Sequence, residues 1–188
     1  MKTKRKIPQL KNPIEQTIDT MNRALENQEY FVALTMALII PDLCSQIQYP
    51  NEEYVSKRYK QWYKEWLGPT KDELEFIDDS PYLSADLVYE LRNAVVHSAS
   101  SDIKYNHVHQ TQNQLTKFSI LIEKKNDCDI YANHSSITRN NVGTEEREYT
   151  LNLRGFCKKM TDVANVFMRK NSNDILLKNV EFEEVVDI

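Results

Sequence analysis

The sequence predicts a mainly α-helical bundle that carries a small antiparallel β insertion in its second half. Apolar residues recur at helical spacing from about residue 14 to 98, alternate over short stretches between about 103 and 153, and return to helical spacing over about 154–172. With 188 residues, the chain is long enough to bury one hydrophobic core. We therefore expect a single domain over residues 1–188, in which the last helix packs back on the first ones.

The first two helices follow from apolar spacing and from two prolines. Pro13 suits the first turn of a helix, because its missing N–H is not needed there. The apolar positions that follow it are Ile14, Ile18, Met21 and Leu25. A second helix over 28–44 is apolar almost all round, so we expect it at the centre of the bundle. Its longest apolar run, 31–40, is closed by Pro41 and is too short to cross a bilayer, which favours a buried helix over a membrane span.

A third helix is predicted between a polar cap and a Gly-Pro pair. Asn51 followed by two glutamates is typical of a helix start, and Gly68-Pro69 is typical of a helix end. The large residues between them are Tyr54, Val55, Tyr59, Trp62, Tyr63 and Trp66. Aromatic residues at helical spacing belong to a core far more often than to a base-stacking platform, so we predict that they are buried.

Beyond residue 102 the sequence changes character. Short strands are expected over about 117–123, 129–137 and 148–153, and a final helix is expected from about 154 to 172. The two ends of the chain are highly charged. The basic run at 2–6 is expected to be a solvated, disordered tail, and the acidic run at 181–187 is expected to fray.

Composition excludes several function classes. A formal net charge of −4 argues against a surface that coats nucleic acid, although a local cleft with an arginine can still hold a short RNA segment. Three cysteines without a Cys-x-x-Cys pair, together with an N-terminus that lacks a signal peptide's apolar stretch, indicate a reduced, cytoplasmic setting. The chain has only three glycines and lacks the glycine-rich motif of a phosphate-binding loop. His107 and His109 alternate without a third ligand fixed by spacing, so we expect no metal and no other cofactor.

Residues 84–98 hold the one pattern that points to a reaction. On a helical wheel Leu87, Leu91 and Val95 share an apolar face, whereas Asn93 and His97 lie roughly opposite it. The long side chain of Arg92 can reach both of them, so we expect a cluster of Arg92, Asn93 and His97 on the outer face. A histidine in the last turn can also be there simply because the helix dipole favours its charge, and this alternative stays open. The neighbours Tyr89 and Val96 make the face half apolar, as a face covered by a partner is.

The segment resembles the Arg-x4-His signature of the HEPN superfamily of small helical proteins, in which the residue after the arginine is typically polar, as Asn93 is. The resemblance covers about residues 14–98. It implies a metal-independent endoribonuclease that dimerises so that two motifs face each other across a cleft. Arg92 would then stabilise charge on the scissile phosphate, His97 would act as general base or acid, and Asn93 would orient the imidazole or bind phosphate. The products would carry 2′,3′-cyclic phosphate and 5′-hydroxyl ends.

The sequence departs from one branch of this superfamily. Members paired with a nucleotidyltransferase antitoxin have a Tyr two residues after the histidine, where this chain has Ala99. Two hypotheses therefore remain. The first is a homodimeric endoribonuclease, acting as a bacterial toxin or defence protein. The second is a non-catalytic helical module that binds a partner protein or a nucleotide. Under the first, we expect that replacing Arg92 or His97 with Ala removes cleavage without unfolding the chain.

Overall fold

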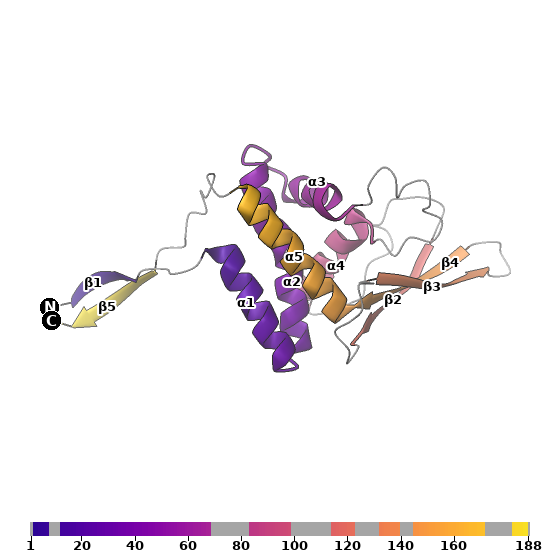
Figure 1. Cartoon of the computed structure of the whole chain (residues 1–188), viewed down its shortest axis with the longest axis horizontal. Coiled ribbons are helices and arrows are strands. Elements are labelled where there is room, and N and C mark those ends of the chain that lie inside the picture. The colour runs from indigo at the N-terminus through magenta and orange to yellow at the C-terminus, as the bar shows by residue number, and fades with distance from the viewer. Residues whose placement is uncertain are drawn as a thin grey trace.

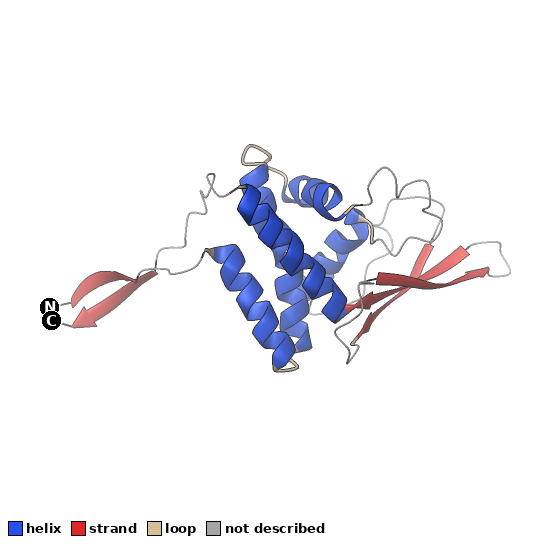
Figure 2. Ribbon diagram, in the orientation of Figure 1, coloured by secondary structure: helices blue, strands red, loops and turns tan. Residues whose placement is uncertain are grey.

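The computed structural model describes residues 2–7, 12–68, 83–98, 114–122, 132–139, 145–171 and 182–187. Within these ranges the chain is mainly helical, as expected, and the helices form the body of the molecule in Figures 1 and 2. The elements in chain order are β1 (Lys2–Ile7), α1 (Pro13–Glu26), α2 (Tyr30–Gln48), α3 (Val55–Leu67), α4 (Ala85–Ser98), β2 (Gln114–Leu121), β3 (Ala132–Arg139), β4 (Glu145–Asn152), α5 (Leu153–Lys170) and β5 (Phe182–Asp187).

The central position predicted for the second helix is confirmed, because α2 contacts each of the other four helices. The helix is longer than the sequence indicated. Pro41, which closes the longest apolar run, lies inside the helix and is buried. With 19 residues α2 is long and apolar enough to cross a membrane, but half of the apolar window is buried within the bundle, as is usual for a core helix.

Local capping explains where α1 and α3 begin and end. Asn12 and Glu15 form a reciprocal capping box, with the Glu15 N–H donating to Asn12 Oδ1 at 2.9 Å, so α1 begins at the predicted proline. The predicted cap of α3 at Asn51 is wrong. Glu52 instead accepts from the backbone N–H of Tyr54 at 3.2 Å, which holds the chain extended until α3 begins at Val55. Gly68 ends α3 as predicted, and a Cβ there would collide with the Lys64 carbonyl.

The aromatic residues of α3 belong to the core, which confirms their predicted role. Tyr59, Trp62 and Tyr63 are completely buried, but Tyr54 and Val55 are exposed, so the predicted burial of these two residues is wrong. The rings of Trp62 and Phe167 meet edge to face with centroids 5.8 Å apart, so α5 packs back on the bundle as expected. Helices from both halves of the sequence thus share one hydrophobic core.

The three strands between α4 and α5 form a sheet in the order β2-β4-β3. Strand β3 runs antiparallel to β4, but β2 runs parallel to it, so the predicted antiparallel insertion is wrong. Consecutive strands joined by short turns usually pair with each other, and a meander would have placed β3 in the middle. Here β4 is central and leads directly into α5, whose first turn is capped by Asn152 accepting from the Gly155 N–H at 3.1 Å.

The two charged termini are paired with each other, which corrects the expectation of a disordered tail and a frayed end. Strands β1 and β5 form an antiparallel ribbon that lies apart from the helices in Figure 1. Its register places Lys2 opposite Asp187, Arg5 opposite Glu184 and Lys6 opposite Glu183. Basic and acidic residues at facing positions favour such pairing. Neither run predicts this pairing by itself, because the two complementary runs lie at opposite ends of the sequence.

Candidate functional site

Helix α4 carries all three residues of the predicted motif. It begins where the Ser84 hydroxyl accepts a hydrogen bond from the Leu87 N–H at 3.2 Å. Its apolar face is buried, as the helical wheel predicts, at Leu87, Val88, Leu91 and Val95. His97, in the last turn, is exposed. The helical wheel therefore predicted the exposed position of His97 correctly.

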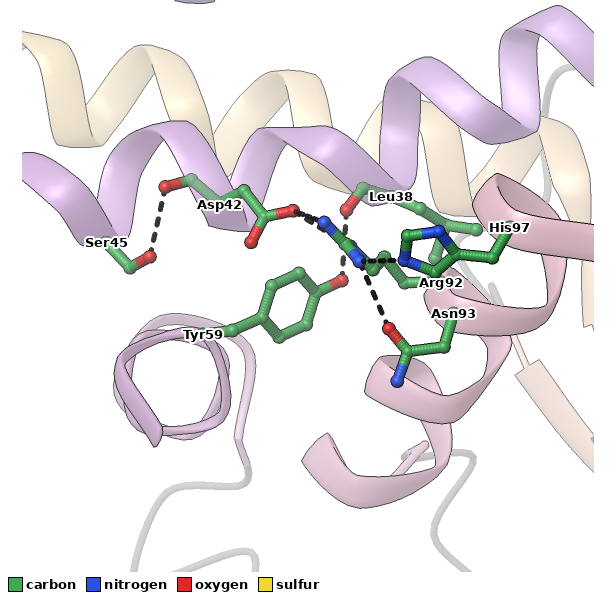
Figure 3. Close-up of polar contacts among 7 residues, drawn as sticks. All are labelled: Leu38, Asp42, Ser45, Tyr59, Arg92, Asn93 and His97. Carbon is green, nitrogen blue, oxygen red and sulfur yellow. Dashed lines mark hydrogen bonds and ion pairs between the residues drawn. The ribbon is translucent and has the colours of Figure 1, made fainter. Parts of the chain in front are cut away.

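Arg92, Asn93 and His97 come together as expected, with the guanidinium at the centre (Figure 3). Arg92 Nη1 donates to Asn93 Oδ1 at 3.1 Å and lies 3.2 Å from His97 Nε2. The asparagine contacts the arginine, and in this part of the chain no hydrogen bond joins Asn93 to the imidazole. The side chain of Asn93 therefore helps to orient Arg92 rather than His97.

A fourth residue, which the sequence analysis missed, holds the other side of the guanidinium. Asp42 on α2 accepts a hydrogen bond from Arg92 Nε at Oδ2, at 3.0 Å, and the same oxygen forms an ion pair with Arg92 Nη2, also at 3.0 Å. Only 18% of the Arg92 side chain and 12% of the Asp42 side chain are exposed. The expectation that Arg92 lies off the core is therefore wrong. A signal existed, because Asp42 is the sole charged residue of α2, and a charge in a buried helix needs a partner.

Burial dominates the electrostatics of Asp42. It raises the pKa of this carboxyl above the ordinary 3.8, while the neighbouring guanidiniums of Arg92 and Arg58 oppose the rise. Asp42 Oδ1 is buried and has no hydrogen-bond partner among the described residues, so the carboxyl is paired through Oδ2 alone. The nearby Tyr59 hydroxyl donates elsewhere, to the Leu38 carbonyl at 3.1 Å. The ion pair with Arg92 is thus the main compensation for burying this charge.

The free energy of unfolding of the wild type, minus that of Asp42→Asn, is expected to fall as pH rises. Because the pKa of Asp42 is raised in the folded chain, the folded state still holds this proton just above pH 3.8, where the unfolded state has released it. The folded state binds more protons in that window, so the contribution of Asp42 to the free energy of unfolding falls as pH increases. Urea denaturation of both proteins between about pH 3 and pH 7 measures the difference. A difference that grows with pH would contradict the raised pKa.

The apolar surface beside the site is smaller than the sequence predicts. Tyr89 packs edge to face against Tyr59 of α3, with ring centroids 5.2 Å apart, and the Lys60 ammonium lies 5.1 Å from its ring centre. The chain itself therefore covers Tyr89. Val96, next to His97, stays 38% exposed and is the apolar contribution of α4 to the surface beside the site.

Other reactive groups in the described part of the chain are poor candidates for chemistry. Cys44 and Cys157 are buried free thiols, and burial raises the pKa of both, that of Cys157 to about 12. No group of three metal-ligating side chains forms within the described ranges, and the pair His107 and His109 lies outside them. A polar surface hollow along α1 shares no residue with the Arg92 cluster.

Comparisons with known proteins add no relative to this picture. No family model, curated protein or solved structure matches the chain. The chemistry that the site can perform depends on two groups. These are a guanidinium that is held on three sides and an exposed imidazole in contact with it.

Proposed function

We propose that this protein is a metal-independent endoribonuclease of the HEPN type, which works in the cytoplasm as a homodimer and serves as a toxin or defence protein. One observation carries the proposal: Arg92 Nη1 lies 3.2 Å from His97 Nε2 at an exposed end of a helix. A permanent cation beside an imidazole, which can accept and donate a proton, is what phosphodiester cleavage needs without a metal.

The proposed reaction uses the ribose of the RNA as its nucleophile. An imidazole takes the proton of a 2′-hydroxyl, whose oxygen attacks the adjacent phosphorus. The P–O5′ bond breaks, the departing 5′-oxygen receives a proton, and a 2′,3′-cyclic phosphate remains. Arg92 stabilises the negative charge that builds up on the phosphate oxygens. A dimer brings two copies of His97 to one cleft, one to accept a proton and the other to donate one.

The non-catalytic alternative has its own support in the contacts of Arg92. The Nε, Nη1 and Nη2 atoms of this side chain all contact groups of the same chain. A polar network that is satisfied internally is also what a purely structural role requires. In that case the exposed face around Asn93 and His97 would bind a partner protein or a nucleotide without cutting it.

Two matched oligonucleotides test the proposed reaction. The first is a single-stranded RNA, and the second has the same sequence with every 2′-hydroxyl methylated. In EDTA, the full-length protein is expected to cut the first into fragments that end in 2′,3′-cyclic phosphate and to leave the second intact, because the methylated sugar has no nucleophile. Cutting of the methylated strand would exclude this chemistry. Failure to cut either strand would favour the binding module.

A further inference from the structure

The hydrogen bonds of Arg92 fix where the proton of His97 sits. A guanidinium stays protonated and has N–H donors but no acceptor. In the contact between Arg92 Nη1 and His97 Nε2 at 3.2 Å, the arginine must therefore donate and the imidazole nitrogen must accept. A neutral imidazole that accepts at Nε2 carries its proton on Nδ1. A protonated imidazole would have N–H groups at both nitrogens and would lose this contact.

Asp42 determines which edge of the guanidinium faces the histidine. Its Oδ2 accepts a hydrogen bond from Arg92 Nε and lies 3.0 Å from both Nε and Nη2, so the edge formed by those two atoms is turned toward α2. The remaining nitrogen, Nη1, is then directed at Asn93 and His97, as Figure 3 shows. Asp42 never contacts the imidazole and acts on it only through the arginine.

We propose that Asp42 is a positioning residue of the site, which holds Arg92 so that Nη1 keeps neutral His97 in the tautomer with its proton on Nδ1. We call the chain of contacts from Asp42 through Arg92 to His97 the relay. Helices α2 and α4 contribute its two ends, and the carboxylate is more deeply buried than the imidazole. The order of groups is carboxylate, guanidinium and imidazole, from the core outward.

The consequence of this positioning for catalysis rests on the proposed function. While Arg92 Nη1 donates to Nε2, the lone pair that a general base needs is occupied. A phosphate oxygen of RNA that binds Nη1 takes over this hydrogen bond and frees Nε2 to accept the proton of a 2′-hydroxyl. Asp42 keeps Nε and Nη2 in place while Nη1 changes partners. Binding of the phosphate and exposure of the base are thus one event.

Nitrogen NMR of the full-length protein labelled with ¹⁵N-histidine tests the relay without RNA. At a pH where the imidazole is neutral, the ¹⁵N shifts of His97 are expected to report a protonated Nδ1 and an unprotonated Nε2. Asp42→Leu removes both acceptor oxygens at similar volume, and is expected to shift His97 to a mixture of tautomers. Asp42→Asn keeps one acceptor oxygen for the guanidinium and is expected to retain the wild-type tautomer.

The matched control is Asp86→Leu. Asp86 is also an ion-paired aspartate of low exposure, but its partner is Lys60, at 2.7 Å. The Asp86→Leu variant is therefore expected to keep the wild-type tautomer of His97. A proton on Nε2 in the wild type, or a wild-type tautomer in Asp42→Leu, would overturn the proposal. The wild-type spectrum decides the tautomer even if Asp42→Leu does not fold. Because no RNA is present, failure of the relay and failure of RNA cleavage are separate results.

Discussion

RNA cleavage by His97→Gln is expected to be at least about a hundredfold slower than cleavage by the wild type, the usual contribution of a side chain that transfers protons. Glutamine can still accept a hydrogen bond from Arg92 but cannot exchange a proton near neutral pH. His97 is exposed, so the variant is expected to unfold at the wild-type temperature. Initial rates on a labelled single-stranded RNA, with thermal unfolding followed by circular dichroism, measure both effects.

Two outcomes would contradict this expectation. A cleavage rate equal to that of the wild type would remove His97 from the mechanism. A large fall in unfolding temperature would show that the imidazole supports the fold, contrary to its exposed position on α4. Lys57→Gln is a suitable control, because it changes an exposed residue whose ion pair with Glu52 lies at the start of α3, apart from the site.

Arg92→Met is expected to lower the free energy of unfolding by about 3–5 kcal/mol, because it leaves the buried carboxylate of Asp42 without its partner. Urea denaturation at neutral pH measures the loss. This expectation replaces the one drawn from the helical wheel, which treated Arg92 as removable without effect on folding. Loss of cleavage in an Arg92 variant therefore counts as evidence for catalysis only if the variant is shown to be folded.

The double variant Asp42→Leu/Arg92→Met separates the two roles of the arginine. Replacing both members of a buried ion pair by apolar residues of similar volume is often neutral or stabilising, so the double variant is expected to recover most of the lost stability. It should nevertheless fail to cleave RNA, because no guanidinium remains to bind the phosphate. If Arg92→Met alone were as stable as the wild type, the ion pair would contribute nothing to folding.

The sequence predicted most of the helical fold and three of the four residues in the cluster. Both successes depend on local periodicity, which places Leu91 inside and His97 outside whatever lies around α4. The sequence indicates that Asp42 needs a partner, but it does not identify Arg92 as that partner, because the two residues lie on different helices and 50 positions apart. Periodicity says which face of a helix is buried, but it does not say which residue of another helix packs there.

The β structure shows the same limit. Alternation located three strands roughly correctly within 114–152, yet it carries no information on the order in which strands pair. The parallel pairing of β2 with β4 is a property of the folded chain. Similarly, the facing register of β1 and β5 becomes evident only when two runs from opposite ends of the sequence are considered together.

The most direct test of the central claim, that Arg92 and His97 form a reaction centre for RNA, is an analysis of fragment ends. A transfer RNA pool is incubated in EDTA with the wild type and with His97→Gln, purified side by side so that any contaminating nuclease is common to both. We predict fragments with 5′-hydroxyl and 2′,3′-cyclic phosphate ends from the wild type and none from the variant. Equal fragmentation by both proteins, or none by the wild type, would contradict the claim.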